Sequence, residues 1–296
     1  MRIYHESSHI GLFYSLDIRK TTYAPVGAVL PSICEDAGAD IVSFGMAERQ
    51  TRIIARRLAA GEPASAITDV PGTCFMTDFE HLPAKYVECA GFAKVSSDKL
   101  AYAKATRIQM DNQDPVTGQI VVQKQRSGYL VQNPPAKPLN RLELDAVYAL
   151  PYTRRYHPSY EALGGVPAIK EVEFSIIQNR GCFGGCNFCA ITMHQGRRVT
   201  SRSADSIVQE GERIATDPDF KGYIHDVGGP TANFRFPACE KQLTKGTCPN
   251  RALLKLSSRS LKQTILMVTH DEKAALEADR ILVMEDGRIV SDRKRG

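Results

Sequence analysis

The chain has 296 residues, enough for one large or two modest domains, and its hydrophobic content of 43% is sufficient for globular cores. It shows no apolar run near about 18 residues and no charged leader before an apolar stretch, so neither a membrane span nor a signal peptide is predicted. Eight cysteines are too sparse for a disulfide-stapled scaffold, and a mild net charge of +5 allows a nucleic-acid partner without supporting one.

The first 133 residues alternate strand and helix signals and predict an α/β module with a Rossmann-like sheet. The predicted elements are strands at 39–45 and 67–76, helices at 47–60 and 98–109, and a hairpin over 119–132. Gly61 is expected to end the first helix, and Ser97 to cap the second. The hairpin turn is expected near Ser127-Gly128. Asp40 and Glu48-Arg49 flank the first strand and could face a ligand crevice, but they are interpreted as helix-entry and ion-pair residues.

Residues 134–170 are expected to form an extended linker. Their prolines interrupt regular structure throughout the segment. These prolines are Pro134, Pro135, Pro138, Pro151, Pro158 and Pro167.

Residues 171–251 predict a strand, a loop, a helix and a second strand. Val172, Phe174 and Ile176 alternate with polar residues as in a strand, and Ser203 is placed to cap a helix that runs to about Ala215. The next strand signal covers residues 223–227. A helix between two strands predicts a βαβ unit, so we expect the two strands to lie parallel with a right-handed crossover.

Three cysteines follow the first of these strands with the spacing C-x3-C-x2-C: Cys182, Cys186 and Cys189. Three thiolates so close in sequence, on a glycine-rich loop, can surround one small metal centre. A [4Fe–4S] cluster takes four cysteines, one per iron, so three leave one iron open to a cofactor. The spacing alone also fits structural zinc, which needs a fourth ligand. Candidates for that ligand are His194, Cys239 and Cys248.

The second strand ends at Gly228-Gly229, followed by Pro230-Thr231. In a (β/α) barrel, ligands bind at the carboxyl ends of the strands. The cysteine loop and the Gly-Gly turn are therefore expected on the same face. Glycines there permit close approach of the backbone to a ligand.

The stretch from Arg180 to Cys189, with Phe188 before the third cysteine, resembles the radical-SAM signature. With residues 191–197, 201–203 and 228–233, and with upstream stretches such as 39–49, it looks like the YgiQ family of bacterial radical-SAM proteins, whose reaction is unassigned. The resemblance covers most of residues 24–251.

This resemblance implies a [4Fe–4S] cluster on Cys182, Cys186 and Cys189, with S-adenosylmethionine held by the backbone near Phe188 and by Gly228-Gly229. The implied reaction is reductive cleavage of S-adenosylmethionine to a 5′-deoxyadenosyl radical, with an electron donor such as flavodoxin or ferredoxin. The implied location is the reducing cytoplasm.

The chain also departs from that family. Family members are longer at both ends, and only about 80 residues separate the first barrel-like strand from residue 252, whereas a complete barrel takes about 250 residues. We therefore expect a partial radical-SAM (β/α) barrel with impaired turnover. Cys239 and Cys248 resemble the start of a cysteine-rich insert, and their role is left open.

Residues 252–296 resemble the C-terminal part of an ABC-transporter ATPase, with a strand at 264–269 and a hairpin turning at Asp286-Gly287. His270 would match the histidine that senses the γ-phosphate, but it is interpreted as an ordinary strand-end residue. The sequence holds no G-x-x-x-x-G-K-[ST] loop, so nucleotide hydrolysis is not expected. The alternatives to an enzyme are a zinc-stabilised binding module and a non-functional chimera with an ABC fragment.

Overall fold

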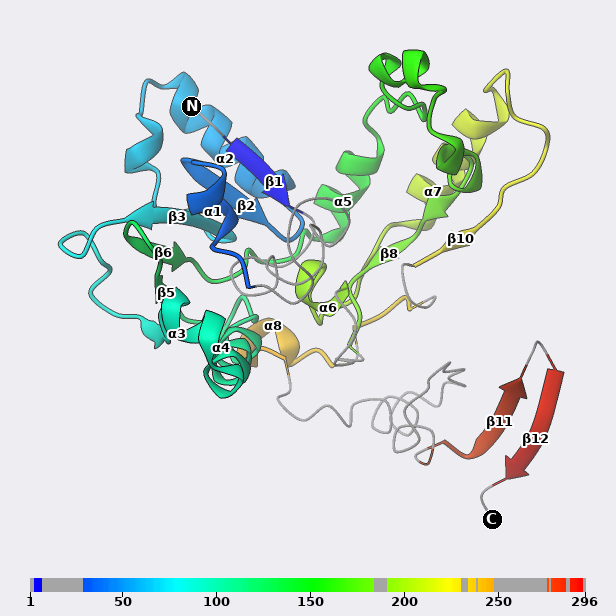
Figure 1. Ribbon diagram of the computed structural model, residues 1–296. Helices are drawn as coiled ribbons and strands as arrows, with labels where there is room; N and C mark the ends of the chain where they lie inside the picture. Colours follow the sequence, from blue (N-terminus) through cyan, green and yellow to red (C-terminus); the bar gives the residue numbers. More distant parts are fainter. Residues whose placement is uncertain are drawn as a thin grey trace. The chain divides into compact units, whose positions relative to one another are not determined.

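The computed structural model describes residues 3–6, 29–183, 191–229, 234–237, 239–247, 276, 278–285 and 288–294 (Figure 1). The chain divides into two compact units, Met1–Pro249 and Asn250–Gly296. The boundaries predicted for the smaller domains stay predictions.

The first unit is a mixed α/β structure, which confirms the predicted fold class. Its strands are β1 (Ile3–Glu6), β2 (Ile41–Phe44), β3 (Thr73–Thr77), β4 (Val87–Cys89), β5 (Val121–Lys124), β6 (Tyr129–Gln132), β7 (Ile176–Ile177), β8 (Asn179–Arg180), β9 (Thr200–Ser201) and β10 (Val227–Gly228). Its α-helices are α1 (Ile33–Asp36), α2 (Glu48–Ala59), α3 (Phe92–Ser97), α4 (Lys99–Asp111), α5 (Arg141–Tyr148), α6 (Ile191–His194), α7 (Ala204–Ala215) and α8 (Gln242–Lys245).

The first six strands form one mixed sheet in the order β1-β2-β3-β6-β5-β4. The outer pairs β1–β2 and β4–β5 are parallel, while the inner pairs β2–β3, β3–β6 and β5–β6 are antiparallel. The hairpin was predicted from the sequence and is confirmed. Strand β2 lies inside the sheet, so both of its faces need apolar cover, and all four of its residues are buried.

Helices cover both faces of this sheet, as the alternation of side chains along β2 requires. Val42 packs in a cluster with Ile33 and Cys34 of α1, whereas Ile41 packs on the other side with Ile54 of α2. Helix α2 is confirmed close to its predicted limits, and Gly61 follows it with φ +89°. A left-handed glycine just past a helix end allows the chain to turn away.

Asp98, not Ser97, caps α4, so the predicted cap was wrong by one residue. The Asp98 carboxylate accepts hydrogen bonds from the backbone nitrogens of Leu100 at 2.8 Å and Ala101 at 3.2 Å. Ser97 ends α3 and donates its hydroxyl to the Ala93 carbonyl at 2.9 Å. A carboxylate is favoured at this place because the amino end of a helix attracts negative charge.

The segment predicted as an extended linker contains α5, which corrects that prediction. Asn140 and Glu143 form a capping box, in which each side chain accepts from the backbone nitrogen of the other at about 3 Å. This signal outweighs the prolines, which lie before and after the helix. The six-stranded sheet and the helices packed on it, up to residue 132, are called the sheet module below. Figure 1 shows α5 between the sheet module and α7.

Strands β7 and β10 are parallel, as predicted, but both are shorter than the sequence suggested. Val172 lies outside β7, after a 3₁₀ helix over Pro167–Glu171, and Tyr223 is exposed ahead of β10. Helix α7 is confirmed, with Ser203 as its cap. Its apolar face packs Ile207 and Ile214 against Phe174 and Ile176.

A buried ion network fixes α7 beneath these strands. The Arg202 side chain is 0% exposed and pairs with Glu210 of α7, which also pairs with Arg154. Arg202 donates to the Ile177 carbonyl at 2.9 Å, so the network reaches the end of β7.

The second unit contains an antiparallel hairpin of β11 (Arg280–Glu285) and β12 (Arg288–Lys294). This confirms the hairpin predicted around Asp286-Gly287, residues that themselves lie outside the described ones, as do the predicted strand 264–269 and His270. Among the described helices, none is long and apolar enough to cross a membrane.

The ion network predicts the effect of removing one partner. Replacing Glu210 by glutamine should lower the free energy of unfolding by about 3 kcal/mol, because the buried Arg202 loses its carboxylate. Glu212→Gln, at an exposed position of the same helix, is the matched control and should change it by about 0.5 kcal/mol or less. Urea unfolding followed by circular dichroism measures both; equal midpoints for the two variants would contradict a buried network.

Candidate functional site at the ends of two parallel strands

Residues 178–183, which follow β7, are called the cysteine segment below. The parallel pairing of β7 and β10 brings the start of this segment and the Gly-Gly turn to the same edge of the two-stranded sheet. The Gln178 nitrogen, just after β7, donates to the Gly228 carbonyl at 2.8 Å. Gly228 is buried, and Cys182 follows Gln178 by four residues. This confirms that β7 and β10 end side by side at Gln178 and Gly228-Gly229, and Cys182 follows after the short strand β8.

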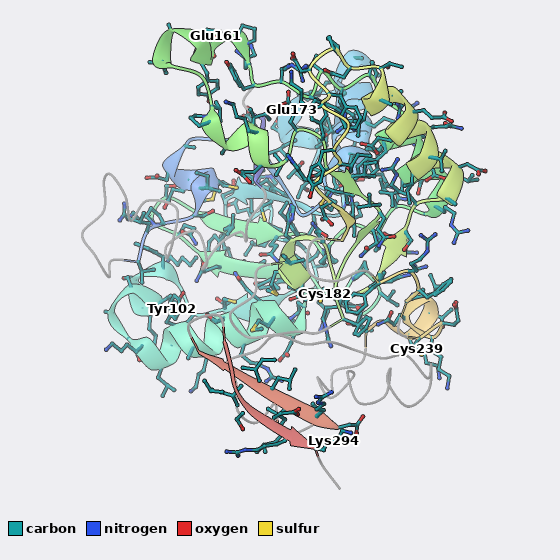
Figure 2. All side chains as sticks on the ribbon, turned by 90° about the vertical axis from the view of Figure 1, so that its right-hand side faces the viewer. Tyr102, Glu161, Glu173, Cys182, Cys239 and Lys294 are labelled. Carbon is teal, nitrogen blue, oxygen red and sulfur yellow. The ribbon has the colours of Figure 1, made fainter. Side chains whose placement is uncertain are left out.

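Gly181 controls the direction in which the chain enters the cysteine loop. It has φ +86°, and a Cβ added there would collide with the Arg198 carbonyl oxygen. Its nitrogen donates to Gln195 Oε1 at 3.0 Å, and the Cys182 nitrogen donates to the Gly196 carbonyl at 3.1 Å. Residues 195–198 therefore form a wall against which Cys182 is held, buried, in the centre of the first unit (Figure 2).

The chain that returns after the Gly-Gly turn packs on the same loop. The rings of Phe183 and Phe234 lie 4.3 Å apart between centroids. Arg235 donates to Gln178 Oε1 at 3.2 Å, and its own carbonyl accepts from the Ser201 hydroxyl at 2.8 Å. These contacts shield the region of Cys182 with aromatic and backbone groups.

Arg180, immediately before Gly181, ties this edge to the sheet module. Its Nη1 donates to Glu48 of α2 at 2.6 Å, and its Nε donates to the Tyr148 hydroxyl at 3.2 Å. Arg49, beside Glu48, pairs with Glu143 of α5 at 2.7 Å. The interpretation of Glu48-Arg49 as ion-pair residues is confirmed, but no pattern in the chain predicted their partners.

The rest of the predicted donor set is only partly placed. Cys186, Phe188, Cys189 and Cys248 lie outside the described residues. Cys239 is exposed beside α8, and His194 ends α6 (Figure 2). Among the residues that the structure describes, no group of three His, Cys, Asp or Glu side chains is arranged to hold a metal ion.

The other described cysteines belong to the sheet module. Cys34 and Cys74 lie in the core beside Val42, and Cys89 ends β4 and packs against Ala105 of α4. Burial, with a smaller effect of Glu88, raises the pKa of the Cys89 thiol to about 12. A thiol with so high a pKa is inert at neutral pH, so Cys89 has a packing role.

A cavity of about 210 Å³ lies between the sheet module and the cysteine segment. Its walls come from the β2–α2 turn, from residues 113–116, 135–139 and 242–247, and from residues 193–198 that hold Cys182. No sequence pattern predicted this cavity, because its walls are far apart in the chain.

Asp114 closes one side of the cavity. Its two oxygens accept from the backbone nitrogens of Val116 and Thr117, at 2.8 and 3.0 Å, and from the Thr247 nitrogen and hydroxyl, at 2.7 and 2.8 Å. Burial alone would raise the pKa of Asp114, but these hydrogen bonds together hold it below its usual range. Asp114 thereby fastens the segment after α8 to the sheet module.

The geometry at Gly181 predicts a specific sensitivity. Gly181→Ala combines a left-handed backbone with a collision, whereas Gly196→Ala, at φ +85°, meets nothing within 4 Å. Backbone strain should cost each variant about 1–2 kcal/mol of unfolding free energy, and the collision should cost Gly181→Ala about 1–3 kcal/mol more. Chemical denaturation measures the difference; equal losses would show that the loop relaxes freely.

The contacts of Asp114 predict a pH effect. Its stabilising contribution should be complete above the unfolded pKa of about 3.9 and be lost as the pH falls through the lower folded pKa. Asp114→Asn should therefore lower the free energy of unfolding by about 2 kcal/mol at pH 7. The gap between variant and wild type should begin to narrow below about pH 3.9 and close as the pH falls through the lower folded pKa of Asp114. Asp111→Asn, at an exposed position, is the control; a gap that stays constant with pH would contradict the assignment.

Comparison with known proteins matches residues 25–175 to the family described as Radical SAM N-terminal. A UPF0313 protein of Clostridium perfringens is 53% identical over 224 residues, 75% of this chain and 34% of the relative. One of Clostridium botulinum is 49% identical over 224 residues, 76% of this chain and 35% of the relative. No solved structure matches.

The chain spans about a third of the length of the curated relatives it matches. The family match itself covers half of the chain, from the residues before α1 to the last residues before β7. This chain therefore belongs to the Radical SAM N-terminal family.

Proposed function

We propose that this chain is a YgiQ-type radical-SAM protein that holds a [4Fe–4S] cluster on Cys182, Cys186 and Cys189. The observation that carries the proposal is the hydrogen bond from Gln178 to the Gly228 carbonyl at 2.8 Å, which joins the cysteine segment to the Gly-Gly turn. The proposed cofactor contacts are the backbone near Phe188 and Gly228-Gly229.

The donor set supports a cluster on chemical grounds. Three thiolates within eight residues suit iron–sulfur chemistry, and three leave an iron open for a cofactor. The left-handed Gly181 gives the loop its entry direction, and a side chain there would fill the space taken by the Arg198 carbonyl. When bound, such a cluster supplies an electron for reductive cleavage of S-adenosylmethionine.

The chain's own residues have separate tasks in this proposal. Cys182 contributes a thiolate from a buried position, and residues 195 and 196 fix its backbone. Phe183 and Phe234 exclude water from the loop. The Gly228-Gly229 turn offers backbone groups to the amino acid part of S-adenosylmethionine. A small electron-transfer protein such as flavodoxin or ferredoxin is the proposed reductant.

Cluster assembly is tested by iron and sulfide content after anaerobic reconstitution. Wild type should take up about four irons per chain. Serine at position 182, 186 or 189 should reduce this by more than half, whereas Cys239→Ser, at an exposed cysteine, should not. Electron paramagnetic resonance of the reduced protein should change when S-adenosylmethionine is added. Iron content unchanged by Cys186→Ser, or one retained zinc that depends on Cys239, would reject the cluster.

We further propose that residues 252–296 derive from an ABC-transporter ATPase. The β11–β12 hairpin and the separate compact unit Asn250–Gly296 support this origin. Because the sequence has no phosphate-binding loop, the full chain should show no ATP binding at micromolar concentration. Detection of the peptide across residue 252 by mass spectrometry tests whether the joined chain is expressed.

A further inference from the structure

The cavity beside the cysteine segment has a strongly basic lining. Of the described residues that line it, five are arginine or lysine, and only Asp114 carries a carboxylate. Arg49 and Arg180 already pair with Glu143 and Glu48. The Asp114 carboxylate already accepts two hydrogen bonds at each oxygen. Lys137 and Arg198 form no ion pair with a described carboxylate, so the described part of the lining carries more positive than negative charge.

Buried polar atoms in the same lining have no hydrogen-bond partner among the described residues. Gln242 is 5% exposed, and neither its amide nitrogen nor its amide oxygen is hydrogen-bonded. Gln50 Oε1 and Arg198 Nε are also buried without a hydrogen-bond partner among the described residues. Such atoms are rare in folded proteins, because each one costs about 1–3 kcal/mol when it is buried without a partner. Four such atoms, on three residues around one cavity, indicate a ligand that supplies both acceptors and donors.

The chemistry of these groups defines the ligand. Guanidinium groups match the planar or tetrahedral oxygens of a carboxylate or phosphate, and amides complete the hydrogen bonds. At about 210 Å³ the cavity is below the roughly 300–1,000 Å³ of pockets for drug-sized ligands, so the ligand is small. We propose that this cavity binds a small substrate through its oxyanion group.

This inference rests on the proposed radical-SAM function, because it concerns the substrate of the same site. The wall formed by Gln195 and Gly196 lines the cavity on one side and holds the backbone of Gly181 and Cys182 on the other. A substrate anchored there by its charged end would lie next to the cysteine segment.

Inorganic phosphate and malonate serve as probes of the two oxyanion classes, with the full chain at constant ionic strength and chloride as reference. At least one probe should raise the thermal unfolding midpoint in a saturable way. Arg198→Met and Gln242→Leu should weaken its apparent affinity at least about tenfold. Arg56→Met, which removes the same charge from an exposed position of α2, should leave it unchanged. Without probe, Gln242→Leu should be no less stable than wild type, because an unpaired buried amide is removed.

The outcomes distinguish failure of the proposed anion site from failure of the proposed cluster. A response to phosphate alone identifies a phosphate-bearing substrate, and a response to malonate alone a carboxylate. No saturable response, or an equal loss in Arg56→Met, overturns the proposal. Iron content should stay at the wild-type level in Arg198→Met and Gln242→Leu, whereas Cys182→Ser should lose iron and keep the probe response. If saturating S-adenosylmethionine abolishes the response of the reconstituted protein, the cavity belongs to the cofactor and the substrate assignment fails.

Discussion

Two arginines from different parts of the chain stack on the ring of Tyr148, and this contact joins three elements of the first unit. The guanidinium carbon of Arg202 lies 4.3 Å from the ring centroid, and that of Arg180 lies 5.1 Å from it. Two cations on one aromatic ring gain from its negative face, and more so where water is excluded. Tyr148 ends α5, so this helix joins the strand that leads into the cysteine loop to the loop that begins α7.

Charged groups fix the position of α5 from both sides. Glu143 pairs with Arg49 of α2, while Asp145 accepts from the Ser203 nitrogen at 3.0 Å at the start of α7. Arg213 of α7 donates back to the carbonyl of Tyr148 at 3.0 Å. These charged groups are partly exposed, so each contact adds little net stability, but together they define where α5 lies. This arrangement sets the sheet module against the cysteine segment.

The cavity is a consequence of that arrangement. The β2–α2 turn, with Arg49 and Gln50, forms one wall, and residues 193–198 form the opposite one. Because residues 195 and 196 also hold the backbone of Gly181 and Cys182, a change in the cavity wall reaches the cysteine loop through two hydrogen bonds. If the proposed substrate and cluster bind there, the two would be coupled over a short distance, through the Gln195 side chain and the Gly196 carbonyl.

Features carried by short stretches of sequence could be predicted. Periodicity, caps and turn residues within about 60 residues of chain predicted five features. These are helices α2 and α7, the β5–β6 and β11–β12 hairpins, and the parallel pairing of β7 with β10. The C-x3-C-x2-C spacing and the Gly-Gly turn located the candidate site in the same way. The wrong predictions also concerned short stretches. Asp98, a stronger acceptor one residue after Ser97, caps α4, and the prolines around α5 led to the prediction of a linker despite its capping box.

The tertiary structure alone decided which distant residues meet. Arg180 and Glu48 are 132 residues apart, and Asp114 and Thr247 are 133 apart, and no pattern in the chain pairs them. Their pairing depends on the order of the strands and on the docking of α5, both set by the burial of many side chains together. The sequence thus determined the elements and the donor groups of this protein. Packing decided the cavity, because its walls exist only after the sheet module and the cysteine segment come together.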